Sequence, residues 1–233
     1  MAVRSDGLQT EKRILQACVR LFLENGYRRT TMLQIFKEAQ VSSGSFQNLF
    51  HSKDGVLLEL VKFMFENQFG MARSVAGAEL PPVYVYAAET ALQITLTELN
   101  ENLREIYLEA YTQEHLLDYI QRATAKELHR IFGPYQPGLT EQDYYELELG
   151  TAGLMRGYMA NPCTADFPLE RKLEKFLTLA LRGYKVPEEE LQQALSFLAG
   201  LDMRRIARLV MEELFRLLAM HYEFSLDGLL PRG

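Results

Sequence analysis

Small hydroxyl and amide side chains are concentrated in the stretch VSSGSFQNLFHSKDGV, residues 41–56. If a short helix begins after Ser42, its outer face carries Ser45, Gln47 and Asn48. These side chains donate and accept hydrogen bonds without carrying a charge, and Asn and Gln can pair with two atoms of an adenine edge. The chemistry that this stretch favours is therefore recognition of base edges.

The same short helix has the two other features that a helix in a DNA groove needs. Ser42, Ser43 and Gly44 are small, so the backbone N–H groups at the positive helix end can approach a phosphate. Three apolar side chains share the opposite face and are expected to pack inward: Phe46, Leu49 and Phe50. Because a lone Ser-Ser-Gly segment is more often a simple turn, the interpretation rests on the whole set.

The neighbouring elements place this helix in a helix-turn-helix. Apolar residues follow a helical stripe over residues 11–25, and Gly26 stands where a C-cap belongs. Thr31 to Gln34 matches a capping box, which predicts a second helix to about Ala39. Two helices of about eight residues joined by a tight turn have the dimensions of a helix-turn-helix, whose second helix enters the major groove.

The rest of the chain is predicted to be helical as well. Ser52 caps a linking helix over residues 53–76. Proline and glycine breaks separate the later helices, which are expected at about 82–100, 102–132, 140–160, 166–184, 187–199 and 202–222. The fold class is all-α, with a three-helix DNA-binding domain at residues 1–53 and a larger helical ligand-binding and dimerisation domain at residues 77–233.

Composition narrows the class of protein. No apolar run approaches the roughly 20 residues of a membrane span, and no apolar segment follows the charges of MAVRSDGLQTEKR as in a signal peptide. Cys18 and Cys163 are far apart, which indicates a reducing, cytoplasmic location without disulfides. The four histidines form no ligand pattern with them, so neither a metal nor a cofactor is expected.

Charge is distributed unevenly along the chain. The net charge is −6, but residues 1–53 hold 8 Lys/Arg against 4 acids, whereas the remaining residues hold 17 bases and 27 acids. A basic head of about +4 on an acidic body of about −10 suggests an anionic partner for the head alone.

The order of these pieces resembles the DNA-binding domain of the TetR family of bacterial transcriptional regulators. The matching segments lie between Ile14 and Val61 and read ILQACVRLFLENGYRRTTM, IFKEAQVSSGSF and LFHSKDGVLLELV. The resemblance implies a homodimer that binds a palindromic operator in double-stranded DNA. It also implies repression that a small-molecule effector releases, with the linking helix as the lever.

The resemblance assigns DNA contacts residue by residue. The positions that it carries over are Thr31, Ser42, Ser43, Gly44, Ser45, Gln47, Asn48, His51 and Lys53. Thr31 caps its helix at a phosphate, and Lys53 clamps another. The family commonly has glycine at Gln40, a basic residue at Ser43 and tyrosine at Gln47. Gln40 is therefore expected in the left-handed region, and His51, Arg28 or Arg29 is expected to replace the missing phosphate contacts.

A regulator of this kind needs two copies, because two recognition helices about 34–36 Å apart fit a palindrome. In similar proteins, two C-terminal helices of each subunit form the interface. Apolar stripes on helices 170–184 and 187–199 are the predicted interface: Phe176, Leu177, Ala180, Leu181, Tyr184, Leu191, Leu195 and Leu198. The alternative is that these stripes are ordinary core, and the role of helix 202–222 stays open.

A small-molecule pocket is expected between the head and the interface. Tyr107, Tyr111 and His115 are spaced to share one helical face. The predicted lining is Tyr107, Tyr111, Tyr145, Met155, Arg156 and Met159. Arg156 lies among small and apolar residues, so if buried it needs a glutamate or an anionic ligand. A packed core with an internal Arg–Glu pair is the alternative.

Two other classes of protein are alternatives to the regulator. An enzyme is not supported, because the sequence has no nucleophile with a positioned base, no phosphate-binding loop and no carboxylate–histidine metal set. The remaining alternative is a helical small-molecule carrier or protein-interaction module without specific DNA binding. The basic head favours the regulator, because a carrier does not need one.

Overall fold

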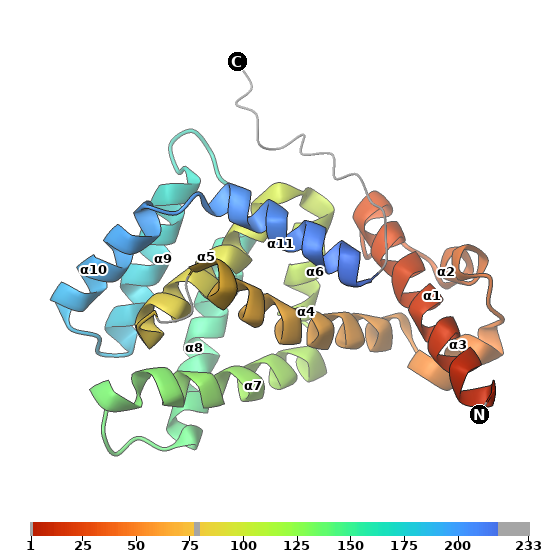
Figure 1. Cartoon of the computed structure of the whole chain (residues 1–233), viewed down its shortest axis with the longest axis horizontal. Coiled ribbons are helices and arrows are strands. Elements are labelled where there is room, and N and C mark those ends of the chain that lie inside the picture. The colour runs from red at the N-terminus through yellow and green to blue at the C-terminus, as the bar shows by residue number, and fades with distance from the viewer. Residues whose placement is uncertain (1, 77–79, 219–233) are drawn as a thin grey trace.

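The computed structural model describes the backbone of residues 2–76 and 80–218, and the side chains of residues 7–64 and 80–218. Within these ranges every long element is an α-helix, which confirms the all-α prediction (Figure 1). The helices are α1 Ala2–Asn25, α2 Met32–Ala39, α3 Ser43–Phe50, α4 Lys53–Ala76, α5 Pro82–Leu99, α6 Glu101–Ala110, α7 Glu114–Phe132, α8 Glu141–Ala160, α9 Leu169–Gly183, α10 Glu188–Ala199 and α11 Met203–Leu217. None of the described helices is long and apolar enough to cross a membrane.

The local signals around α2 and α3 act as predicted. The Thr31 hydroxyl accepts from the backbone N–H of Gln34, and the Gln34 side chain accepts from the backbone N–H of Thr31, which is a complete capping box. Gln40 follows α2 with φ 53° and ψ 50°, the expected left-handed conformation. Ser42 caps α3 by accepting from the backbone N–H of Ser45.

The prediction of one helix over residues 102–132 is wrong. The chain turns at Tyr111 to Gln113 and separates α6 from α7. Tyr111 leaves the helix at φ −85° and ψ 8°, and its hydroxyl donates to Gln93 Oε1 at 3.1 Å. Because of this turn, His115 is exposed and does not share a face with the buried Tyr107 and Tyr111.

Helix α5 lies at the centre of the larger helical body (Figure 1). Its side chains are buried nearly all round, so other helices must cover every face. Aromatic rings fill the space at its N-terminal end: Phe132 and Tyr184 stack with ring centroids 4.3 Å apart, and Tyr86 meets both edge-on. This packing fixes the positions of α7 and of the end of α9 around α5.

The predicted dimer residues lie inside the chain's own core. Seven of them are buried within a single chain: Phe176, Leu177, Ala180, Leu181, Tyr184, Leu191 and Leu198. Leu195 is partly buried and packs against the same core. The apolar stripes of α9 and α10 face the body because α5 and α8 need covering, so the assignment of these side chains to an interface is wrong.

Helix α11 joins the body to the N-terminal helices. Leu214, Phe215 and Leu218 line an apolar cavity of about 50 Å³ together with Phe22 and Leu23 of α1. The Gln16 side chain also donates to the carbonyl of Leu218 at 2.6 Å. The helix predicted at 202–222 thus packs against both units. Its last four residues lie outside the described part of the chain.

Candidate nucleic-acid interface

Helix α3 presents a polar outer face and anchors its inner face. Eight of the nine side chains assigned to DNA are exposed: Thr31, Ser42, Ser43, Gly44, Ser45, Gln47, Asn48 and His51. Phe46 and Phe50 are buried, and their rings contact each other at 5.8 Å between centroids. Leu49 was predicted to point inward, but it is 38% exposed because it falls between the two buried phenylalanines and the outer face.

The first turn of α3 is open to solvent. The hydroxyls of Ser42 and Ser45 are hydrogen-bonded at 2.9 Å, so the cap is rigid while both residues remain exposed. A side chain added at Gly44 would meet only Ser42 Oγ, at 3.8 Å. An approaching phosphate therefore has access to the backbone N–H groups at this positive helix end.

Lys53 does not reach out to clamp a phosphate, so that prediction is wrong. Its ammonium donates to the carbonyls of Tyr27 at 2.8 Å and Thr30 at 3.0 Å, and it lies 4.3 Å from the centroid of the Tyr27 ring. Two hydrogen bonds and the ring contact hold the ammonium against the segment between α1 and α2. Lys53 therefore fastens α4 to this loop.

Arg28 and Arg29 are exposed, but both also contact the body. Arg28 Nε donates to Glu109 Oε1 at 2.5 Å, and its backbone N–H donates to Glu105 at 3.2 Å. Arg29 reaches Asn102 Oδ1 at 3.4 Å. Both arginines therefore contact α6 of the body, while all three predicted substitutes for phosphate contacts, Arg28, Arg29 and His51, are exposed.

Two residues near α3 were missed by the sequence reasoning. Lys37 is exposed in the last turn of α2, and among the described residues no ion pair forms with it. Gly55, in the first turn of α4, permits the close approach of this turn to the end of α3, because a Cβ there would lie 2.0 Å from the carbonyl oxygen of Phe50. His51 adopts φ 60° directly after α3. The sequence could have indicated Gly55, because this glycine directly follows the polar residues at the start of α4.

A polar joint connects the DNA-binding unit to the body. The Tyr27 hydroxyl donates to the carboxylate of Asp54, at the start of α4. Gln113, which precedes α7, donates to the same carboxylate at 3.3 Å, and Asn102 of α6 donates to the Leu23 carbonyl at 2.7 Å. Burial, followed by the bond to Asp54, raises the pKa of Tyr27. The orientation of the head is thus tied to α6 and α7.

The predicted ligand residues do not share one pocket. Tyr107 and Tyr111 line a cavity of about 20 Å³ between α4, α5, α6 and α7. Met155 and Met159 are buried core residues that line none of the cavities described here. Arg156 was expected to be buried, but it is exposed and donates from Nε to the Thr112 hydroxyl at 3.2 Å. Gly153 and Gly157 of the same helix are exposed as well, so this face of α8 points to solvent.

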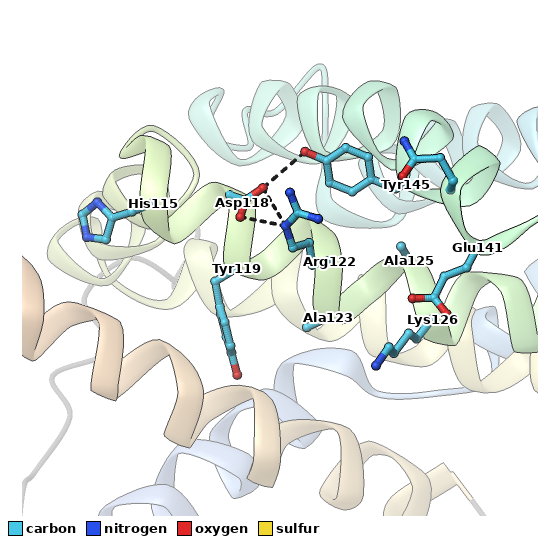
Figure 2. A pocket seen from close by; sticks show the side chains of 10 residues that line it. His115, Asp118, Tyr119, Arg122, Ala123, Ala125, Lys126, Glu141 and Tyr145 are labelled. Atoms are coloured by element: carbon cyan, nitrogen blue, oxygen red, sulfur yellow. Dashed lines mark hydrogen bonds and ion pairs between the residues drawn. The ribbon is translucent and has the colours of Figure 1, made fainter.

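Tyr145 lies in a separate, open groove of about 500 Å³ on the outer side of α7 (Figure 2). Its hydroxyl donates to Asp118 at 3.3 Å. Arg122 donates to both oxygens of Asp118 and lies 5.1 Å from the centroid of the Tyr145 ring. The Arg122 guanidinium holds the pKa of the Asp118 carboxyl below its usual range. These two charges neutralise each other, so the groove offers little net charge to a ligand.

The fold and the exposed face of α3 define a helix-turn-helix protein with a larger all-helical body. The family model described as bacterial regulatory proteins, tetR family, matches residues 14–60. Residues 14–60 are therefore similar to the DNA-binding part of this family.

Two curated relatives share the N-terminal part. The uncharacterized HTH-type transcriptional regulator YuxN of Bacillus subtilis (strain 168) is 30% identical over 97 residues, which cover 42% of this chain and 31% of that protein. The HTH-type transcriptional regulator HbdR of Aromatoleum sp. (strain CIB) is 33% identical over 93 residues, which cover 37% and 41% respectively. The match therefore spans less than half the length of either relative.

One solved structure extends the likeness to the body. The crystal structure of a gamma-butyrolactone receptor (ArpA-like protein) matches with a TM-score of 0.50 and 14% identity, and the match covers 87% of this chain and 99% of that one. At this identity the likeness concerns the fold alone.

Proposed function

We propose that this chain is a ligand-responsive transcriptional repressor that binds a palindromic operator as a homodimer. The observation that carries the proposal is the geometry of α3. Gln47 and Asn48 are held outward on a helix whose inner face is locked by Phe46 and Phe50. Rigidly presented amides next to an open helix N-terminus suit base edges and phosphates at the same time.

The phosphate contacts are assigned to the groups that remain free around α3. Ser43 and Gly44 are exposed at the start of α3, Lys37 is exposed in the last turn of α2, and His51 is exposed directly after α3. Each phosphate that a cation neutralises contributes about one unit to the logarithmic slope of DNA affinity against salt, so we expect the affinity to fall as the salt concentration rises.

The outer side of α8 and α9 is the surface that we assign to a second copy of the chain. These helices run antiparallel, since Thr151 meets Tyr184 at 2.7 Å and Tyr158 meets Phe176 at 5.7 Å between ring centroids. Their solvent side carries Leu149 at 48% and Leu179 at 54% exposure, and several open glycines: Gly150, Gly153, Gly157 and Gly183. Exposed apolar side chains beside small residues suit close, self-complementary packing.

Helix α6 is positioned to couple a ligand to the head. One of its faces lines the small cavity with Ile106, Tyr107 and Ala110, and another holds Arg28 through Glu105 and Glu109. A molecule that enlarges the cavity must displace α6, α5 or α4. It shifts the DNA-binding equilibrium only if it binds the displaced arrangement more tightly.

The proposal is tested by a mobility-shift assay with the DNA upstream of the gene for this chain at two salt concentrations. We expect specific, salt-sensitive binding by a dimer, which a double Gln47→Ala, Asn48→Ala variant loses at unchanged thermal stability. A chain that stays monomeric, or that binds all DNA equally, is instead the carrier or interaction module considered above.

A further inference from the structure

The charged groups buried around α5 narrow the chemistry of the effector, an inference that rests on the proposed function. The cavity lined by Tyr107 and Tyr111 is also lined by Gln93, one of a buried polar stripe on α5 that includes Tyr86 and Glu89. Behind Tyr111 lies Glu148 of α8, which is 6% exposed. The buried groups on this side of the body are carboxyls, amides and phenols.

Glu148 has no cationic partner among the described residues. Its carboxylate accepts from the Thr151 hydroxyl at 2.5 Å, and the Tyr184 hydroxyl is hydrogen-bonded to the same Thr151. The titratable groups that face it from the packed helices are Tyr86 of α5, Tyr111 after α6 and Tyr184 after α9. Burial raises the pKa of this carboxyl to about 7. A buried carboxyl without a counter-charge is costly to ionise, so a cation that reached it would be strongly favoured.

Two largely buried cations of the body share one carboxylate, that of Glu98. Lys172 is fully buried and donates to Glu98 Oε1 at 2.7 Å, and Arg104 donates to the other oxygen of Glu98 at 3.0 Å. Arg156, the cation expected to face an anionic ligand, is on the surface. The body as a whole also carries the acidic excess of the chain. Within the described residues, these buried cations therefore pair with Glu98, and neither pairs with Glu148 beside Tyr111.

We infer that the effector is an organic cation with an apolar group, its charge held by Glu148 and the rings of neighbouring tyrosines, and its apolar part in the cavity beside Tyr107. Tyr111 separates the two subsites: its ring lines the cavity, and its hydroxyl bonds Gln93. The cavity of about 20 Å³ holds no more than a water molecule, so the ligand must displace the Tyr111 ring. That displacement pulls at the end of α6, whose earlier turns hold Arg28. Aromatic faces around a desolvated cation add to the attraction.

The test uses three probes with one carbon skeleton, namely 4-phenylbutylammonium, 4-phenylbutanol and 4-phenylbutanoate, titrated calorimetrically into the full chain at pH 8. We expect the cation to bind at least about tenfold more tightly than the alcohol, and the anion not to bind. Glu148→Gln should cost the cation about tenfold and leave the alcohol unchanged. Glu146→Gln is the matched control, because it removes the same charge from an exposed position two residues away on the same helix.

A second readout does not depend on a variant. At pH 7 the cation should displace the proton of Glu148, so the measured heat should change with the ionisation enthalpy of the buffer. Failure of the cation to bind, equal binding of all three probes, or an unchanged cation affinity in Glu148→Gln would overturn the inference. These titrations contain no DNA. Cation binding without any effect on operator binding would leave this site intact and instead refute the proposed regulation.

Discussion

The buried Glu148 carboxyl should make the folded chain less stable as pH rises. Its pKa increases from 4.5 to about 7 on folding, because burial disfavours the charged form. The folded state therefore binds the proton more tightly than the unfolded chain. At about 1.4 kcal/mol per pH unit, this group costs about 3 kcal/mol of stability between pH 4.5 and pH 7, and the loss is complete above pH 7. At pH 4 both states are protonated and the cost vanishes.

Urea unfolding of Glu148→Gln and of the unchanged chain, measured from pH 5 to pH 8, checks this reasoning. The amide stays neutral at every pH, so the variant should gain about 3 kcal/mol over the unchanged chain at pH 8 and much less at pH 5. Glu146→Gln should follow the unchanged chain throughout, since position 146 is exposed. Parallel pH profiles for Glu148→Gln and the unchanged chain would show that this carboxyl is solvated or paired, and the argument from its burial would fail.

Three further outcomes follow from the geometry of the head. Gly55→Ala places a Cβ 2.0 Å from a backbone oxygen and should cost about 3 kcal/mol in urea unfolding, whereas Gly44→Ala, with open space around it, should cost nothing. Lys53→Ala should lower the melting temperature without changing the salt dependence of DNA binding, whereas Lys37→Ala should reduce the logarithmic salt slope by about one; the reverse pattern would restore Lys53 as the phosphate contact. Gln47→Ala should weaken operator binding by about 1–3 kcal/mol and leave non-specific binding nearly unchanged, and equal losses on both DNAs would contradict base reading.

Most of the fold could be predicted from local sequence signals. The capping box at Thr31, the left-handed Gln40 and the proline breaks depend on neighbouring residues, so they could be predicted from the sequence. The turn between α6 and α7 could not, because it is fixed by a hydrogen bond from Tyr111 to Gln93 on another helix. A continuous helical pattern does not reveal a break that is stabilised by tertiary contacts.

The candidate site likewise has features that could be predicted from the sequence and features that could not. Exposure of Gln47 and Asn48 follows from helical periodicity, but the partner of a charged side chain does not. The side-chain types of Lys53 and Arg28 suit phosphate contacts. In the structure, however, Lys53 donates to backbone carbonyls and Arg28 donates to Glu109. An apolar stripe likewise shows that a helix face is covered without showing what covers it, so the stripes of α9 and α10 were assigned to a second chain.

The meeting of α1 and α11 bears on how the molecule can be dissected. Phe22 and Leu23 are covered in part by Phe215 and Leu218, from the opposite end of the sequence. A fragment that ends after the linking helix would expose these apolar side chains to solvent and would tend to self-associate. Weak DNA binding by such a fragment would therefore say little about the recognition helix. Chimaeras that exchange heads between related proteins face the same difficulty: the graft has to bring a compatible C-terminal helix with it.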